Sequence, residues 1–284
     1  MSLAQPGSET DTLYCAGLLR DHAPGRYLAS LFAPAGVRPA LFALYAFDHE
    51  IGRVRRLVSE PMAGLIRFQW WRDAIEAIAA GRPAPAQPVA QALQRGWDRL
   101  EPSRQRLEAA IDGRERELEH DPPATLADLE EHLAATSAGP VLAALELLGA
   151  RDPQSVAAGR RVGLAIGLAD LLHEIDLDRE RARFLPREVQ SRHGITARTI
   201  EEASSSRAFA PAIGELADHA REHLRDARRS RRAIPRRALP ALLPGVLVGQ
   251  RLKSLAALGA RGPVRSRTAL APLWLLGYRA LGIF

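Results

Sequence analysis

Two residue types are almost missing from this sequence, and each absence excludes a class of site. Cys15 is the only cysteine in 284 residues, which excludes an intramolecular disulfide and a cysteine-based metal cluster. Lys253 is the only lysine, so arginine supplies 38 of the 39 basic residues. This skew, together with abundant alanine and proline, indicates genome composition rather than selection at one surface.

Long apolar runs are missing as well. No run reaches the roughly 18–20 apolar residues that a membrane-spanning helix needs, and residues 1–11 are polar and acidic, unlike a signal peptide. We therefore expect a cytoplasmic protein, with a peripheral contact on the inner membrane as the alternative. The net charge of +6 favours anionic partners. The arginines, however, are mixed with acidic residues, as on ordinary solvated helices, and no known nucleic-acid-binding motif accompanies them. We therefore expect no nucleic-acid binding.

The abundant residues are those of helices. Alanine, leucine, arginine and glutamate dominate, and no segment alternates apolar and polar residues between hairpin turns. Without a linker or a composition break, the sequence predicts one all-α domain over residues 1–284, with residues 1–12 flexible. The expected helices cover residues 11–31 with a break near Pro24-Gly25, 38–58, 60–81, 89–99, 103–119, 125–148, 153–178, 207–232, 241–258 and 269–284, and residues 187–200 form a loop with a short turn. The last helix packs in the core or, alternatively, contacts a membrane surface.

An acidic ladder ends the most apolar of these helices. Asp170, Glu174 and Asp178 are four residues apart, so successive members are neighbours on one helix face. A hard cation such as Mg²⁺ takes oxygen ligands of this kind when it carries a diphosphate. The alternative is that the helix emerges into solvent and becomes charged there. We expect these three side chains to point into the interior.

Charges also gather in the C-terminal half of the helix expected over residues 38–58. Asp48 and Glu50 are two residues apart and do not share a face, and Gly52 stands one turn beyond Asp48. Arg53 and Arg56 follow. They form either solvated ion pairs or a cationic patch that faces a phosphate and lies opposite the acidic ladder.

Small residues predict places where helices approach closely. Gly113 lies inside a helical pattern at a cost of about 1 kcal/mol, which indicates close packing. The segment 137–140, Ser-Ala-Gly-Pro, predicts a kink. Thr125 and Asp128 have the spacing of a capping box.

Read together, three motifs resemble the squalene/phytoene synthase family of all-α isoprenoid synthases, from about Tyr14 to Lys253. They are Tyr45-Ala46-Phe47, the segment Ile111-Asp112-Gly113 through Glu117, and Gly163-x-Ala165 through Phe184-Leu185-Pro186. The resemblance implies a helical bundle with a central cavity, in which Mg²⁺ held by two facing carboxylate motifs assists departure of a diphosphate from a prenyl chain.

The first of those two motifs is degenerate here. Its carboxylates should fall at Gly52 and Arg56, so one is absent and the other has reversed charge. The second motif keeps Glu174 and Asp178 at its acidic ends, with Asp170 where the family usually has asparagine. Residues 58–62 and 67–73 are similar to a divergent branch of the family that includes a mitochondrial assembly factor for respiratory complex I.

Two functions follow from this resemblance. The first is a non-catalytic protein that binds an isoprenoid diphosphate or another lipid, or that acts in the assembly of a respiratory complex. The alternative is an active, Mg²⁺-dependent prenyl-diphosphate transferase that condenses two isoprenoid diphosphates. No catalytic residue is assigned. The candidate substrate-binding residues are Arg26, Tyr27, Asp48, Arg53, Arg56 and Asp170, and the candidate Mg²⁺ ligands are Glu174 and Asp178, together with Asp170. For Arg26 and Tyr27 the simpler interpretation is a surface arginine and a half-buried tyrosine.

Overall fold

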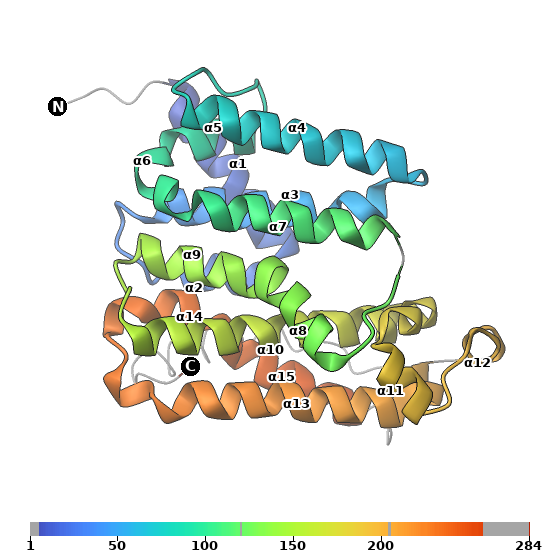
Figure 1. The fold of residues 1–284 in the computed structure, drawn as a ribbon. Helices are drawn as coiled ribbons and strands as arrows, with labels where there is room; N and C mark the ends of the chain where they lie inside the picture. Colours follow the sequence, from blue (N-terminus) through green and yellow to red (C-terminus); the bar gives the residue numbers. More distant parts are fainter. Residues whose placement is uncertain (1–5, 120, 204–205, 258–283) are drawn as a thin grey trace.

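The computed structural model describes residues 6–119, 121–203, 206–257 and 284, and all regular elements of these residues are helical (Figure 1). The α-helices are α1 (Pro6–His22), α2 (Pro24–Ser30), α3 (Arg38–Leu57), α4 (Pro61–Ala79), α5 (Pro88–Arg95), α6 (Trp97–Leu100), α7 (Arg104–Arg116), α8 (Leu126–Leu133), α9 (Gly139–Leu147), α10 (Pro153–Leu177), α11 (Arg187–Arg192), α12 (Ala197–Glu202), α13 (Ala210–Arg229), α14 (Leu239–Leu242) and α15 (Pro244–Ala257). A π turn, Ala134–Ala138, joins α8 to α9.

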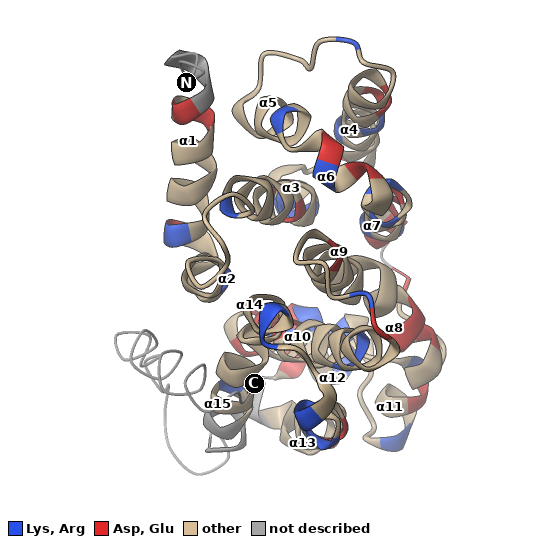
Figure 2. Ribbon diagram, turned by 90° about the vertical axis from the view of Figure 1, so that its left-hand side faces the viewer, with Lys and Arg blue, Asp and Glu red and all other residues tan. Residues whose placement is uncertain are grey.

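The long helices lie side by side and form a bundle. Figure 1 shows α4, α7, α9, α10 and α13 stacked across the view, and Figure 2 looks along them, so that they are seen end-on. Helix α10 packs against α9, α13 and α15, while α3 packs against α1, α5 and α9. Buried apolar residues from Cys15 to Leu252, with Phe284, form one core cluster. The all-α prediction is confirmed.

Helix α10 begins at a defined cap and is apolar on nearly every side. Asp152 accepts a hydrogen bond from the backbone N–H of Ser155 at 2.9 Å, and Pro153 occupies the first turn, where its missing N–H costs nothing. Its residues from Val162 to Ala169 are all buried. A helix of this kind belongs in the centre of a bundle.

Glycines allow the π turn to lie between α7 and α10. A Cβ on Gly113 of α7 would approach Thr136 Cγ2 to 2.5 Å, and one on Gly163 of α10 would overlap the backbone of Ala138. Farther along α10, a Cβ on Gly167 would approach Leu133 Cδ2 to 2.6 Å. The close approach predicted at Gly113 is therefore confirmed.

Several local predictions can be compared with the structure. The break near Pro24-Gly25, the interruption near 137–140 and the capping box of Thr125 with Asp128 are confirmed. The expected loop over 187–200 was wrong, because it contains α11 and the start of α12. Residues 6–12, expected in a flexible end, belong to α1. The helix expected over 269–284 lies outside the described residues except for Phe284. No described helix has the length and apolar content to cross a membrane.

Replacing Gly163 by alanine is expected to destabilise the fold. Overpacking of a core costs about 1–3 kcal/mol, and here the new methyl group meets backbone, which yields less than a side chain. That cost should exceed the gain of about 1 kcal/mol in helix propensity. Gly17→Ala in α1 is the matched control, because no atom lies within 4 Å of its Cβ position. Urea unfolding should show a loss for Gly163→Ala and a small gain for the control. Equal stability of the two variants would contradict this account of the packing.

Candidate functional site

Five ion pairs lie along α2, α3, α7 with the turn that follows it, α10 and α15, and we call this group the ion-pair layer. Each pair joins one arginine to one carboxylate. The pairs are Arg26–Asp48, Arg53–Glu50, Arg56–Glu174, Arg114–Glu117 and Arg251–Asp170. The pairs also interact with one another, because the charge of Arg114 acts on Asp48 and Glu174.

The Arg26–Asp48 pair ties α2 to α3 and is the most buried of the five. The Arg26 guanidinium donates to Asp48 Oδ2 and lies 5.1 Å from the centroid of the Tyr45 ring, a cation–π contact. Burial disfavours the charged form of Arg26, but the Asp48 carboxylate outweighs it and holds the pKa of Arg26 above its ordinary value. Asp48 Oδ1 and Tyr45 Oη are buried without a hydrogen-bond partner among the described residues. The interpretation of Arg26 as a surface arginine is therefore wrong, because its side chain lies in the interior.

The Arg114 guanidinium lies against Gly52. Its nearest atoms are 3.7 Å from the position that a Cβ of Gly52 would take. Nη1 donates to Glu117 Oε1 at 2.8 Å, and Nη2 donates to the Thr136 carbonyl at 3.3 Å. Burial alone would raise the pKa of Glu117, but Arg114 and His132 outweigh burial and lower it. A fixed cation therefore stands beside the position where the family resemblance implies a carboxylate.

The acids of α10 have separate partners. Arg56 of α3 reaches across to Glu174, with Nη1 and Oε1 at 3.2 Å, and Arg251 of α15 donates to Asp170 at 2.5 Å. Burial raises the pKa of Glu174, with Arg56 opposing it. Arg56 thus lies opposite the acidic segment, as predicted.

Asp178 leaves the face that the other two acids share. Helix α10 ends at Leu177, and the backbone of Asp178 is extended, with φ −142° and ψ 106°. Its carboxylate accepts from the Glu180 N–H at 3.0 Å and lies 3.7 Å from Arg181 Nε. Both Asp170 and Asp178 have side chains about half exposed, so the three acids do not form the continuous interior ladder we expected.

Two other candidates lie at the edge of the layer. Arg53 pairs with Glu50 on its own helix at 3.2 Å, and its buried Nε has no partner among the described residues. Tyr27 is half-buried and stacks on Phe42 of α3, with ring centroids 5.8 Å apart. The structure therefore brings Arg26, Asp48, Arg53, Arg56, Asp170 and Glu174 to one layer and leaves Tyr27 in a packing contact.

The layer carries no net formal charge, since five arginines face five carboxylates. A metal–diphosphate complex needs carboxylates that are free to take cations. Here each carboxylate of the layer already has a guanidinium, and no acid stands opposite Glu174 at positions 52 or 56. Such an arrangement stabilises a bundle, and its orphaned polar atoms on α3 and α7 leave room for further hydrogen bonds to a polar group.

Four members of the layer, Glu50, Arg114, Glu117 and Arg251, were absent from the candidate residues. Arg114 follows the Asp-Gly pair that was singled out, but its partners Gly52 and Thr136 come from other elements. Arg251 belongs to a helix that was expected only as a core element. The sequence signal for Arg114 was the adjacent Gly113. A glycine inside a helix indicates that another segment packs closely there, which places the neighbouring Arg114 in the interior.

The sequence of this chain is similar to those of known proteins. A family model described as squalene/phytoene synthase matches residues 19–274. The chain belongs to the squalene/phytoene synthase family. Among curated proteins, it is 32% identical over 250 residues to NADH dehydrogenase (ubiquinone) complex I, assembly factor 6, of Bos taurus, covering 88% of this chain and 75% of that protein. It is 25% identical over 221 residues to presqualene diphosphate synthase of Sinorhizobium fredii, covering 76% and 77%.

Two solved synthase structures share the fold. A dehydrosqualene synthase in complex with ligand superposes with a TM-score of 0.77 at 18% identity, covering 96% of this chain and 98% of that one. Squalene synthase HpnC from Alicyclobacillus acidocaldarius superposes with a TM-score of 0.73 at 20% identity, covering 90% and 97%. The predicted isoprenoid-synthase-like fold is confirmed.

Removing Arg26 alone should lower the free energy of unfolding more than removing both members of its ion pair. Arg26→Met leaves the Asp48 carboxylate buried and unpaired, a loss of about 3–5 kcal/mol. Arg26→Met with Asp48→Leu removes both charges and should recover most of that loss. Arg106→Met, which breaks the more exposed pair with Glu146, is the control and should cost about 1 kcal/mol or less. Denaturant titration gives the unfolding free energies of these variants. A double variant no more stable than Arg26→Met would refute the pairing argument.

A carboxylate introduced at position 52 should pair with Arg114. The space at the Gly52 Cβ position is ordinary contact distance, so Gly52→Asp fits. Gly52→Asn is the uncharged control of the same size, and we expect the aspartate variant to be more stable by about 1–2 kcal/mol at pH 7. The guanidinium lowers the folded-state pKa of the new carboxylate below about 3.9, so the difference is present above that pH and disappears as the pH falls further. Equal stability at pH 7 would show that Arg114 is not available to the new group.

Proposed function

We propose that this chain is a non-catalytic member of the squalene/phytoene synthase family that acts in the assembly of a respiratory NADH dehydrogenase. One observation carries the non-catalytic part: Arg114 and Arg56 stand where a synthase of this family would hold the carboxylates of its first motif. The 32% identity to complex I assembly factor 6 supports the assembly part.

The residues fit Mg²⁺ poorly. Two facing carboxylate motifs are what the family resemblance implies for the cations that stabilise a departing diphosphate. In this chain the Glu174 carboxylate faces Arg56, and Asp170 faces Arg251. A cation would have to displace a guanidinium from each acid, with no opposing acid to complete its ligand set.

The proposal also includes weak binding of a lipid phosphate. Arg56 and Arg251 have side chains about half exposed, so either can turn from its carboxylate toward the phosphate of an isoprenoid diphosphate or another lipid. The neutral layer offers no excess positive charge to hold that phosphate tightly. We expect any such binding to be weak and independent of Mg²⁺.

The alternative, an active prenyl-diphosphate transferase, is tested directly. The purified chain is incubated with Mg²⁺ and farnesyl or geranylgeranyl diphosphate, and diphosphate release is measured. Presqualene diphosphate synthase of Sinorhizobium fredii serves as the positive control. We expect no release above background and no Mg²⁺-dependent rise in melting temperature with a non-hydrolysable farnesyl diphosphate analogue. Mg²⁺-dependent release would establish the transferase and overturn the proposal.

The assembly role is tested by deleting the gene and complementing the deletion with the parent gene or with a variant at Glu174. Deletion of the gene should lower NADH dehydrogenase activity in membranes and leave incomplete subcomplexes, and the parent gene should restore both. Glu174→Gln should restore them equally well, because it changes one half-exposed ion pair. A synthase would lose its metal ligand with that change, so failure of this variant, when it accumulates to the parent level, contradicts a non-catalytic role. An intact complex in the deletion strain contradicts assembly.

A further inference from the structure

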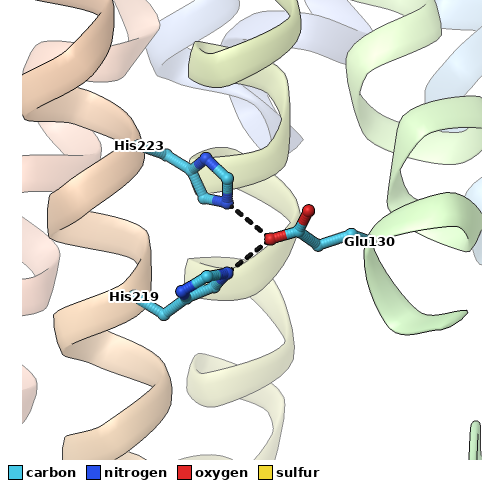
Figure 3. A group of neighbouring side chains, drawn as sticks. All are labelled: Glu130, His219 and His223. Atoms are coloured by element: carbon cyan, nitrogen blue, oxygen red, sulfur yellow. Dashed lines mark hydrogen bonds and ion pairs between the residues drawn. The ribbon is translucent and has the colours of Figure 1, made fainter. Parts of the chain in front are cut away.

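Three side chains that play no part in the ion-pair layer converge between α8 and α13 (Figure 3). His219 and His223 stand one turn apart on α13, and both direct Nε2 at the same oxygen, Oε1 of Glu130 on α8. The His223 Nε2–Glu130 Oε1 distance is 2.9 Å, and the three donor atoms lie within 4.8 Å of one another. Residues 89 and 93 positions apart in sequence thus meet at one point.

The three donors stand on rigid elements. The Thr125–Asp128 capping box fixes the first turn of α8, and Leu129 and Leu133 bury its inner face on either side of Glu130. Helix α13 packs along α10 and buries Ala220 and Leu224 next to the histidines. Donors held by packed helices stay near one another without a ligand, which favours a metal site.

The point of convergence is reachable from solvent. His223 is buried, while the side chains of Glu130 and His219 are 28% and 27% exposed. An ion can therefore enter on the side of Glu130 and His219, and a water can complete its coordination there.

We propose that Glu130, His219 and His223 form a binding site for Zn²⁺. Two imidazole nitrogens and one carboxylate oxygen are a donor set that Zn²⁺ accepts in tetrahedral geometry, with the fourth position open to water. Hard cations such as Mg²⁺ and Ca²⁺ prefer oxygen ligands throughout. Bound Zn²⁺ joins α8 to α13 and stabilises the folded chain, because the unfolded chain does not bring these donors together.

Arg161 of α10 sets how tightly the site binds. Its Nη1 lies 3.3 Å from His223 Nδ1 and 3.2 Å from Asp226 Oδ2. An arginine can only donate, so Nδ1 accepts and the ring proton is on Nε2, where it faces Glu130. Zn²⁺ on Nε2 requires that proton on Nδ1, so Arg161 must leave His223 and keep only Asp226. Arg161 therefore opposes the metal both through the tautomer and through its charge.

The experiment is a Zn²⁺ titration of the full chain after treatment with a chelator, with a chromophoric chelator as competitor. We expect one equivalent bound, a rise in melting temperature, and with Co²⁺ the strong visible absorption of a tetrahedral site. His219→Asn and Glu130→Gln should each weaken binding about tenfold or more. His193→Asn is the matched control, because it removes a histidine from a histidine–glutamate pair with Glu215 and should leave the affinity unchanged.

One variant distinguishes a Zn²⁺ site from a cluster that is only hydrogen-bonded. Arg161→Gln should bind Zn²⁺ severalfold more tightly than the parent, because the amide oxygen can accept from the Nδ1 proton that the metal-bound ring carries. Circular dichroism confirms that each variant is folded, and the two ligand variants lie on different helices. The proposal is overturned if the parent binds less than one equivalent, if His219→Asn and Glu130→Gln bind as the parent does, or if Arg161→Gln binds no more tightly.

Discussion

A charge buried in a helical bundle must have a partner, and this requirement ties α2 to α3. Leaving one member of a buried pair unmatched costs several kcal/mol. Arg26–Asp48 is such a buried pair and joins α2 to α3. The half-exposed pairs Arg56–Glu174 and Arg251–Asp170 join α3 and α15 to α10 and contribute less. Each helix is thus held in register by a partner on another helix, in addition to the apolar core. The pairs fix how the helices meet, while burial of leucine, alanine and valine supplies most of the stabilisation.

Fold and chemistry depend on different residues in this chain. Close packing rests on Gly113 and Gly163, which admit the π turn from both sides. Position 52 is a glycine here, and the chain keeps the fold without the carboxylate that the family resemblance implies there. Its small size instead leaves room for Arg114. A chain can therefore keep the squalene/phytoene synthase fold while a cation takes the place of a metal-binding group.

Sequence reasoning succeeded where the signal is local and repeated. Long amphipathic helices, the Thr125–Asp128 capping box and the break near Gly139 were all predicted from residues close together in the chain. It failed for α11 and α12, because helices of six residues have too little periodicity to be recognised. It also placed Asp178 on the helix face, since the dihedral angles that end α10 one residue earlier depend on tertiary contacts.

The same limit applies to candidate metal ligands. Counting acids along α10 found three carboxylates, but affinity for a cation depends on what each carboxylate faces. Glu174 faces a guanidinium, which cannot become a ligand because it has no lone pair to offer at neutral pH. Glu130 faces two imidazoles, and each becomes a ligand when a proton moves from one ring nitrogen to the other. The spacing of His219 and His223 was visible in the sequence, but their relation to Glu130 arises only when α8 packs beside α13.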